Sequence, residues 1–379
     1  MRIGFYAPLK PPDHPAPSGD RRVARLFITA LRGLGHDVTL LSGLRSYNRD
    51  GDAAREAATV DAAAAEVEML AAAWQKTPQQ KPDLLFTYHV YHKAADYIGP
   101  ALKQRFGLPY VIAEASDSPR RSDGDWAAGY AQAARAIVAA DLLLAVTRYD
   151  IPGLTARADE ARVRYFAPFI EPEPFAAAMA LRVQHRATLA TRFGLPADKM
   201  WLLAVGMMRE GDKLASFRRL ADTLPLLRGD NWHCILVGDG PAREKIAAAI
   251  APQQGLLTLT GQMAPDELAA LYAASDLYVW PAVNEAYGMA MLEAQAAGLP
   301  VLSVRTRGVP DIVEHGVTGW LTPDDRPSTM AGAIRDLLAD PARRQRMAAA
   351  APVRVMNDLS MQAAQTRLRA LFTELGLPA

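Results

Sequence analysis

Two glutamates with the right spacing to hold a ligand stand in one short stretch of this chain. Glu285 and Glu293 are eight positions apart and lie on either side of Gly288. Gly288 precedes a run of good helix formers, so the glutamates bracket the start of an expected helix. The free N–H groups and positive dipole end of a helix N-terminus suit a phosphate group. The two carboxylates would then accept hydrogen bonds from hydroxyls of whatever is attached to that phosphate.

The elements around this pair form an expected βαβ unit. The apolar run Leu277 to Trp280 is typical of a buried strand, and Pro281 ends it because proline cannot donate to a ladder. Gly298 stands where a helix needs a left-handed C-cap, and a second apolar strand follows at Val301 to Val304. Glu293 is unusual in an otherwise apolar helix, which marks it as a candidate binding residue.

A glycine loop with cations follows the expected strand Trp201 to Val205. It begins at Gly206, carries Arg209 and Lys213, and leads into a helix from Leu214. Cations at a helix start neutralise charge that N–H groups alone cannot, so this loop is suited to a diphosphate.

The first half of the chain shows the same alternation of strands and helices. A long proline-rich loop, Pro8 to Asp20, follows the first strand, and loops of this length in compact domains tend to be functional or disordered. His89 and His92 stand at the end of a strand that starts at Asp83, where parallel sheets place ligands. A helix is expected from Lys93 to Phe106.

The whole-chain composition excludes several classes of protein. With 379 residues, a net charge of +1 and one cysteine, Cys234, the chain favours neither nucleic acid as a partner nor a disulfide framework. We find no signal peptide and no apolar run long enough to span a membrane, so we expect a cytoplasmic protein; peripheral contact with the inner face of the membrane is compatible with this. The alternation predicts two doubly wound α/β domains, with residues 1–170 in the first, 171–355 in the second and a C-terminal segment at 356–379.

The stretch NEAYGMAMLEAQAAGLPVLS, which holds both glutamates, resembles a known signature. It is similar to the E-x-F/Y-G-x-x-x-x-E motif of the retaining, nucleotide-sugar-dependent glycosyltransferases of group 1 (family 4), which have the GT-B fold. The resemblance implies two Rossmann-like domains that face each other across a cleft. It further implies that the first binds the acceptor, the second binds the nucleotide sugar, and the final helix crosses back to the first.

The resemblance also assigns roles to individual residues. It implies catalytic roles for Glu285, Arg209 and Lys213, the last two on the leaving diphosphate. The residues expected to bind the donor are Glu293, Gly19, Gly206, Gly238, Tyr287, Gly288, Met289, Ala290 and Met263.

The chain departs from the family pattern at two places. Met207 stands where the family usually has an arginine, so that role passes to Arg209. A family histidine that contacts the transferred sugar is absent after the strand Tyr110 to Ala113. The expected sugar or acceptor contacts are therefore His89, Glu114, Ser116 and Asp117. Arg120 and Arg121, which follow, would suit an anionic acceptor or form a solvated pair of charges.

The expected reaction transfers a sugar from a UDP- or GDP-linked donor to a glycan, lipid-linked or small-molecule acceptor, in glycan, polysaccharide or glycolipid biosynthesis. No cofactor is expected and no metal, because no D-x-D cluster is present. A catalytically degenerate protein that only binds a nucleotide sugar or glycan is the alternative; the two departures favour it and the intact glutamate pair disfavours it. A dehydrogenase is a weaker alternative, because the glycine loops lack a full dinucleotide fingerprint with its acidic residue.

Overall fold

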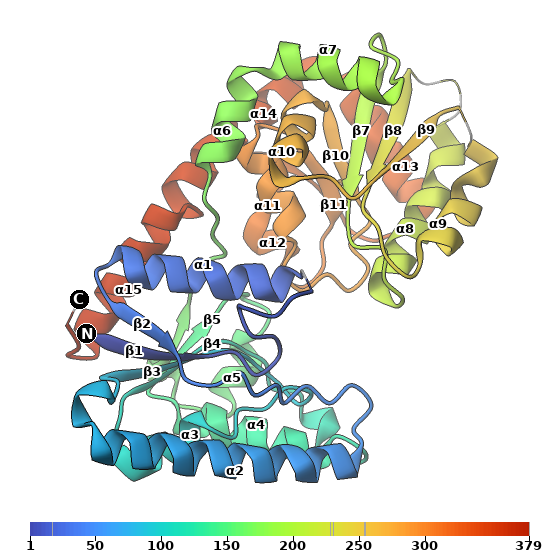
Figure 1. Cartoon of the computed structure of the whole chain (residues 1–379). Helices are drawn as coiled ribbons and strands as arrows, with labels where there is room; N and C mark the ends of the chain where they lie inside the picture. The colour runs from blue at the N-terminus through green and yellow to red at the C-terminus, as the bar shows by residue number, and fades with distance from the viewer. Residues whose placement is uncertain (17, 228, 230, 254, 379) are drawn as a thin grey trace. The chain divides into compact units, whose positions relative to one another are not determined.

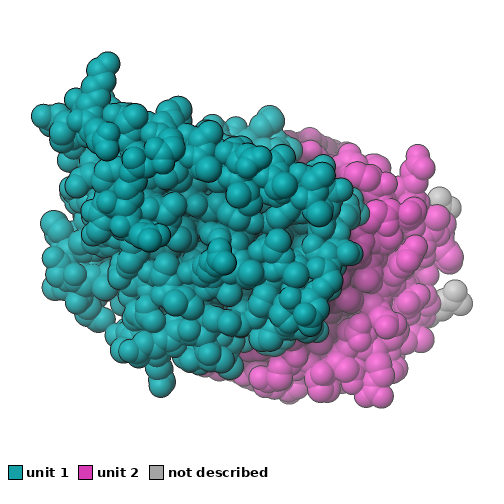
Figure 2. All heavy atoms as spheres, turned by 90° about the horizontal axis from the view of Figure 1, so that it is seen from below, with its two compact units in different colours: residues 1–167, 364–379 teal, residues 168–363 magenta. Residues whose placement is uncertain are grey.

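Strands and helices alternate along the whole chain, as the sequence predicts (Figure 1). The structure is a computed structural model that describes residues 1–16, 18–227, 229, 231–253 and 255–378, so Pro17 of the proline-rich loop lies outside the described residues. The chain divides into two units, coloured separately in Figure 2: unit 1 consists of residues 1–167 and 364–379, and unit 2 of residues 168–363.

Unit 1 is built on a six-stranded, all-parallel sheet in the order β2-β1-β3-β4-β5-β6. Helices α1 and α15 cover one face, and α2, α3 and α4 cover the other (Figure 1). The strands are β1 Arg2–Tyr6, β2 Asp37–Leu40, β3 Leu84–Val90, β4 Tyr110–Ala115, β5 Leu142–Ala145 and β6 Val163–Tyr165. The α-helices are α1 Gly19–Gly33, α2 Ala53–Lys76, α3 Gly99–Phe106, α4 Ala127–Ala139, α5 Ile151–Thr155 and α15 Met361–Glu374, most of which lies in this unit.

Unit 2 has a second six-stranded parallel sheet, in the order β12-β11-β10-β7-β8-β9. Helix α8 contacts α9 and α13 on one side of it, while α6, α7, α10 and α11 form the other group. The strands are β7 Met200–Val205, β8 Trp232–Val237, β9 Leu257–Gly261, β10 Leu277–Trp280, β11 Val301–Val304 and β12 Gly319–Thr322. The α-helices are α6 Glu173–Ala180, α7 Arg182–Phe193, α8 Asp212–Thr223, α9 Arg243–Ile250, α10 Pro265–Ala274, α11 Met289–Ala296, α12 Val309–Ile312, α13 Pro327–Ala339 and α14 Pro341–Asp358.

The strand order of each sheet fixes where a ligand can enter. In unit 1 the chain passes from β1 outward to β2 and then returns to β3 on the other side of β1, so the order reverses between β1 and β3. In unit 2 the reversal lies between β7 and β10. Helices leave the sheet in opposite directions at such a point, which opens a crevice at the carboxyl ends of the two strands.

The segment boundaries differ from those expected at three places. The first segment of unit 1 ends at Ala167 and not at residue 170. The chain leaves unit 2 after Ala363 and not after residue 355, because α14 continues to Asp358 and Ser360 still pairs with Ile170. The expected helix from Lys93 is shorter than predicted and begins at Gly99. The buried carboxylate of Asp96 accepts hydrogen bonds from the backbone amides of Ile98 and Gly99, both at 2.8 Å, and so ends the preceding turn and starts the helix.

Candidate functional site

An ion pair joins the two strand ends that flank the switch point of unit 2. The Nζ atom of Lys213, in the first turn of α8 after β7, lies 2.6 Å from Oε2 of Glu285, which follows β10. The indole N–H of Trp280, the last residue of β10, donates to the same oxygen at 3.0 Å. Both charged side chains are about three-quarters buried or more, so solvent screens the pair only in part. Two residues that the sequence assigned to catalysis therefore meet at the carboxyl edge of this sheet.

Glycines let the backbone come close enough to form this arrangement. A Cβ atom on Gly206 would lie 3.0 Å from the Trp280 ring, so glycine leaves room for that ring beside Lys213. Gly238, with φ near +142°, follows β8, and a Cβ atom there would lie 1.9 Å from the carbonyl oxygen of Gly206. These two expected donor-binding glycines thus pack the turns after β7 and β8 against each other.

The N-terminus of α11 lies directly after Glu285 along the chain. Gly288, the N-cap, has φ near +81°, which glycine adopts without strain. Among the residues that the structure describes, no hydrogen bond is made to the backbone amides of Gly288, Met289 or Ala290. These amides and the helix dipole are available to an anion, and the phosphate site expected from the sequence stays a prediction.

Glu293 is on the same helix and only 4% exposed. The hydroxyl of Tyr272, on α10, donates to its Oε2 atom at 2.9 Å and so fixes the carboxylate. Of the other expected donor contacts, Arg209 is exposed, whereas Tyr287 and Met263 are half-buried.

In unit 1 a histidine lies between two carboxylates at the other switch point. Nδ1 of His89, near the end of β3, is 3.2 Å from Oδ1 of Asp20 and 3.4 Å from Oε1 of Glu114. Asp20 belongs to α1, which follows β1, and Glu114 lies near the end of β4. Both His89 and Glu114 have positive φ, near +65° and +60°, which costs free energy in residues with a side chain. Strain of this kind is concentrated at functional sites, so we regard this cluster as the second candidate site.

The charges in this cluster shift one another's pKa. Burial opposes protonation of His89, but the carboxylates of Glu114 and Asp20 outweigh it and raise the pKa of His89 to about 9. Burial also raises the pKa of Glu114, while His89 and a 2.7 Å hydrogen bond from the Tyr88 hydroxyl partly oppose that rise. His89 is therefore a cation at neutral pH, held between acidic groups.

The other expected contacts in unit 1 have different surroundings. Ser116 donates to Asp150 at 2.7 Å and lies near the same edge. Asp117 has a 3% exposed side chain and pairs with Arg157 at 3.3 Å, so its charge is already compensated within the unit. Gly19 is exposed at the start of α1, where a Cβ atom would meet nothing within 4 Å.

Sequence reasoning missed several residues that build these sites. Trp280 was assigned only to a strand, and Tyr272 only to a helix, although each orients one of the two key glutamates. Asp20 was taken only as a loop residue, and Asp150 was not considered. Their only sequence signal is a polar or aromatic residue beside a strand end or helix start.

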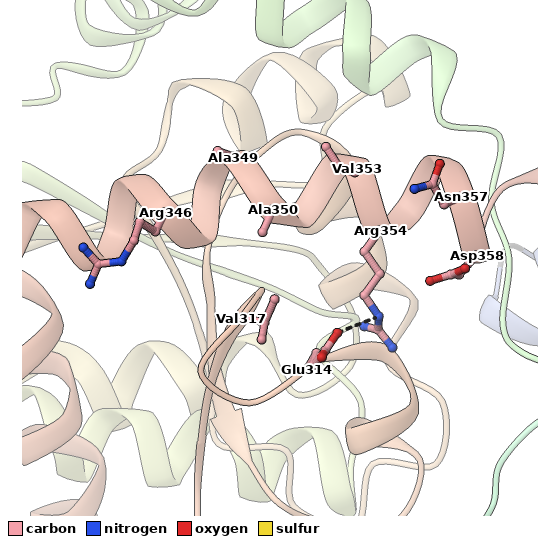
Figure 3. A pocket seen from close by; sticks show the side chains of 9 residues that line it. All are labelled: Glu314, Val317, Arg346, Ala349, Ala350, Val353, Arg354, Asn357 and Asp358. Atoms are coloured by element: carbon pink, nitrogen blue, oxygen red, sulfur yellow. Dashed lines mark ion pairs between the residues drawn. The ribbon is translucent and has the colours of Figure 1, made fainter.

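A shallow hollow of about 600 Å³ lies elsewhere in unit 2, between α14 and the loop at Glu314 and Val317 (Figure 3). The Arg354–Glu314 ion pair, at 3.6 Å, crosses it, and none of the expected site residues lines it. Within the described ranges we find no group of three or more histidine, cysteine or acidic side chains able to hold a metal ion. No helix in these ranges is long and apolar enough to cross a membrane.

Comparison with known proteins shows which proteins this chain is similar to. Residues 199–340, which contain Lys213, Trp280, Glu285 and Glu293, match the family model of the glycosyl transferases group 1. The chain is 31% identical over 194 residues to an alpha-D-kanosaminyltransferase of Streptomyces kanamyceticus, covering 51% of this chain and 50% of that protein. It is 28% identical over 307 residues to a D-inositol 3-phosphate glycosyltransferase of Thermobispora bispora, covering 76% of this chain and 70% of that protein. The chain thus spans only about half to 70% of the length of these relatives.

A solved structure supports the fold of the whole chain. The HepE protein of Anabaena, crystallised in complex with UDP, aligns over 99% of this chain and 100% of its own with a TM-score of 0.73 and 15% identity. The fold is that of the GT-B glycosyltransferases. The segment 199–340 is similar to the group 1 glycosyl transferases.

Proposed function

We propose that this protein is a glycosyltransferase that moves a sugar, with retention of anomeric configuration, from a nucleoside diphosphate sugar to an acceptor hydroxyl. The observation that carries the proposal is the Lys213–Glu285 ion pair at the switch point of unit 2, beside the open amides of α11. A diphosphate at those amides would compete with Glu285 for the ammonium of Lys213. Glu285 would then be free to accept hydrogen bonds from the hydroxyls of the donor sugar.

In this proposal most of the rate enhancement is electrostatic. As the bond between the anomeric carbon and the diphosphate oxygen breaks, negative charge grows on the leaving diphosphate. Lys213 and the amides of residues 288–290 would stabilise that charge, because they are already oriented before the reaction begins, and the exposed Arg209 would add its positive charge. Glu293, fixed by Tyr272, would bind the ribose hydroxyls. A metal is not needed in this scheme, since protein cations take its place.

The acceptor is proposed to bind in unit 1, where His89 and Glu114 can hold its hydroxyls. The proposed donor is a nucleotide sugar with UDP or GDP as its nucleotide, and the HepE structure, which has a similar fold, contains UDP. A role in glycan, polysaccharide or glycolipid synthesis in the cytoplasm, with or without peripheral contact with the membrane, completes the proposal.

The test is release of nucleotide from UDP- and GDP-sugars in the presence of candidate acceptors and EDTA, with wild type and Glu285→Gln. We expect turnover in the wild type and a loss of about 100-fold or more in the variant. The anomeric configuration of the product, followed by NMR, tests retention. Nucleotide binding without turnover for any donor would favour the alternative, a degenerate protein that binds a nucleotide sugar without transferring it.

A further inference from the structure

A group of cations surrounds one indole ring just beyond the carboxyl ends of β3 and β4. The Nζ atom of Lys93 lies 4.6 Å from the centre of the Trp126 ring, and the guanidinium carbon of Arg121 lies 4.8 Å from it. Arg120 is adjacent in sequence, and the His92 ring contacts Trp126 with a centroid distance of 6.0 Å. We call Lys93, Arg120, Arg121, His92 and Trp126 the Trp126 cluster.

The cations of the Trp126 cluster lack compensating carboxylates. No ion pair is formed by Lys93, Arg120 or Arg121 with any residue in the described part of unit 1, whereas Arg105, Lys103 and Arg157 of that unit are all paired. Asp50 acts on the charge of Lys93 and itself lies 3.7 Å from Arg49. The Lys93 ammonium donates a hydrogen bond to the Arg49 carbonyl oxygen at 3.1 Å, which does not neutralise its charge. Like charges held together without paired carboxylates repel one another, so an anion that binds among them is stabilised.

His92 adds an unsatisfied polar group at the same place. Both of its ring nitrogens are buried and have no hydrogen-bond partner among the described residues. Burial, followed by the charges of Arg121, Lys93 and Arg120, lowers the pKa of His92 to about 4, so the ring is neutral at pH 7. A buried polar atom without a partner is costly, and a ligand oxygen would satisfy it.

The backbone around the cluster is tightly fixed. Asn48 is only 3% exposed. Its side-chain Oδ1 atom accepts a hydrogen bond from the Asp52 amide at 3.0 Å, and its backbone carbonyl oxygen accepts one from the Trp126 indole N–H at 3.4 Å. A Cβ atom on Gly129, in the first turn of α4, would lie 2.3 Å from the carbonyl oxygen of His92, so only glycine allows this approach. The cluster is therefore positioned before any ligand binds.

Contacts between neighbouring rings connect the cluster to the His89 site. The centroids of His89 and Tyr91 are 5.0 Å apart, and those of Tyr91 and His92 are 5.3 Å apart. A molecule that places a hydroxyl at His89 and Glu114 could therefore extend along these rings to the cations.

We propose that the Trp126 cluster is a subsite for a phosphate group carried by the acceptor. This inference rests on the proposed function in treating unit 1 as the acceptor-binding unit. Arginine and lysine bind phosphate through charge-assisted hydrogen bonds, and Arg121 offers a planar pair of donors for them.

The direct test is isothermal titration with inorganic phosphate at constant ionic strength. The wild type is compared with Arg121→Ala and Lys93→Ala, and with Arg369→Ala, which removes an exposed arginine of α15 as a matched control. We expect saturable binding in the wild type and in Arg369→Ala, and at least about a tenfold loss of affinity in each cluster variant. Equal affinity in all four proteins, or no saturable binding in any, would overturn the proposal.

Two further measurements identify the role of the site. Phosphate should raise the pKa of His92, followed by its Cε1–H signal in NMR, and leave that of His233 in unit 2 unchanged. Sedimentation with phosphatidylglycerol vesicles separates a soluble phosphate from a lipid headgroup, and binding to vesicles without binding to phosphate would overturn the acceptor subsite.

UDP or GDP binding, measured in the same samples, is expected to be unaffected by Arg121→Ala. A protein that binds nucleotide but not phosphate would refute this inference alone, and one that binds phosphate but no nucleotide would refute the proposed function.

Discussion

Lys213 and Glu285 form an ion pair before any donor binds. Their proposed roles differ, so single substitutions can test each role separately. Lys213→Met keeps the length of the side chain and removes the charge. We expect kcat/KM to fall by about 100-fold, because the leaving diphosphate loses a cation positioned for it. The matched control is Lys245→Met, since Lys245 pairs with Glu210 at 2.8 Å and both are exposed. Equal turnover of Lys213→Met and the control would contradict the assignment.

His89 gives the stability of unit 1 a specific pH dependence. Its pKa in the folded protein, about 9, lies above the ordinary value of 6.5, so the folded state binds the proton more tightly. The stabilisation is therefore complete below pH 6.5 and is lost as the pH rises through 9. The loss should reach at most about 3 kcal/mol.

The measurement is urea unfolding between pH 6 and 10, on the wild type and on His89→Asn. Asparagine tolerates positive φ and does not titrate, so the variant should lack this part of the pH dependence. Parallel stability curves for the two proteins would show that the carboxylates do not raise the pKa of His89.

Single site residues could be predicted from the sequence where they belong to a motif. The residues that contact them in the folded protein could not. Glu285, Glu293 and Lys213 stand in recognisable loops at helix starts. The contact of Asp20 with His89 joins the start of α1 to the end of β3 and depends on the order of β1 and β3 in the sheet. The compensated charge of Asp117 likewise depends on Arg157, which approaches it only in the folded unit.

The turn between β8 and α9 contains Gly238, which lies too close to another backbone segment to carry a side chain. Gly238→Ala would place a Cβ atom 1.9 Å from the Gly206 carbonyl oxygen, and backbone cannot move aside as a flexible side chain can. We expect a loss of about 3 kcal/mol or more in the free energy of unfolding, together with weaker nucleotide binding. Gly194→Ala is the control, because Gly194 also has positive φ but faces open space, and it should cost only about 1 kcal/mol. Chemical unfolding of unit 2 compares them, and similar costs would contradict the close packing of these turns.

The strands and helices could be predicted from short apolar runs and from the helical spacing of apolar residues. The predicted start of α3 was wrong because helix propensity says nothing about a buried carboxylate that caps a later turn. Asp96 does this while its Oδ2 atom also accepts hydrogen bonds from the hydroxyls of Thr87 and Tyr110, both at 2.6 Å. These bonds link β3 and β4 and could not be deduced from local pattern.

The chain builds unit 1 from two separate segments, and this has a consequence for folding. Leu368 and Phe372 of α15 are fully buried, and the Phe372 ring lies 5.8 Å from that of His36. We expect residues 1–167 alone to lack a cooperative unfolding transition, because this apolar face would be uncovered. Residues 168–363 contain a complete sheet and should unfold cooperatively. Circular dichroism during urea unfolding tests both, and a cooperative transition of residues 1–167 would show that α15 is dispensable.

The two-domain α/β class of the whole molecule was predictable because both halves show the same alternation. The family signature was equally visible, since it lies in one continuous stretch. The proposed phosphate subsite was only partly predictable, because the sequence left Arg120 and Arg121 either as contacts for an anionic acceptor or as a solvated pair of charges. Only the fold brings Lys93, His92 and Trp126 to them.

The central claim is that unit 2 binds a nucleoside diphosphate sugar through α11 and its glutamates. A metal-free thermal-shift panel with UDP, GDP, ADP and their sugar conjugates tests it most directly, using the wild type and Glu293→Gln. The account predicts that UDP or GDP and the matching sugar conjugate raise Tm in the presence of EDTA. The variant should need at least about ten times more ligand for the same shift, because it loses a charged acceptor for the ribose hydroxyls. No shift with any nucleotide, or equal shifts in both proteins, would contradict the account.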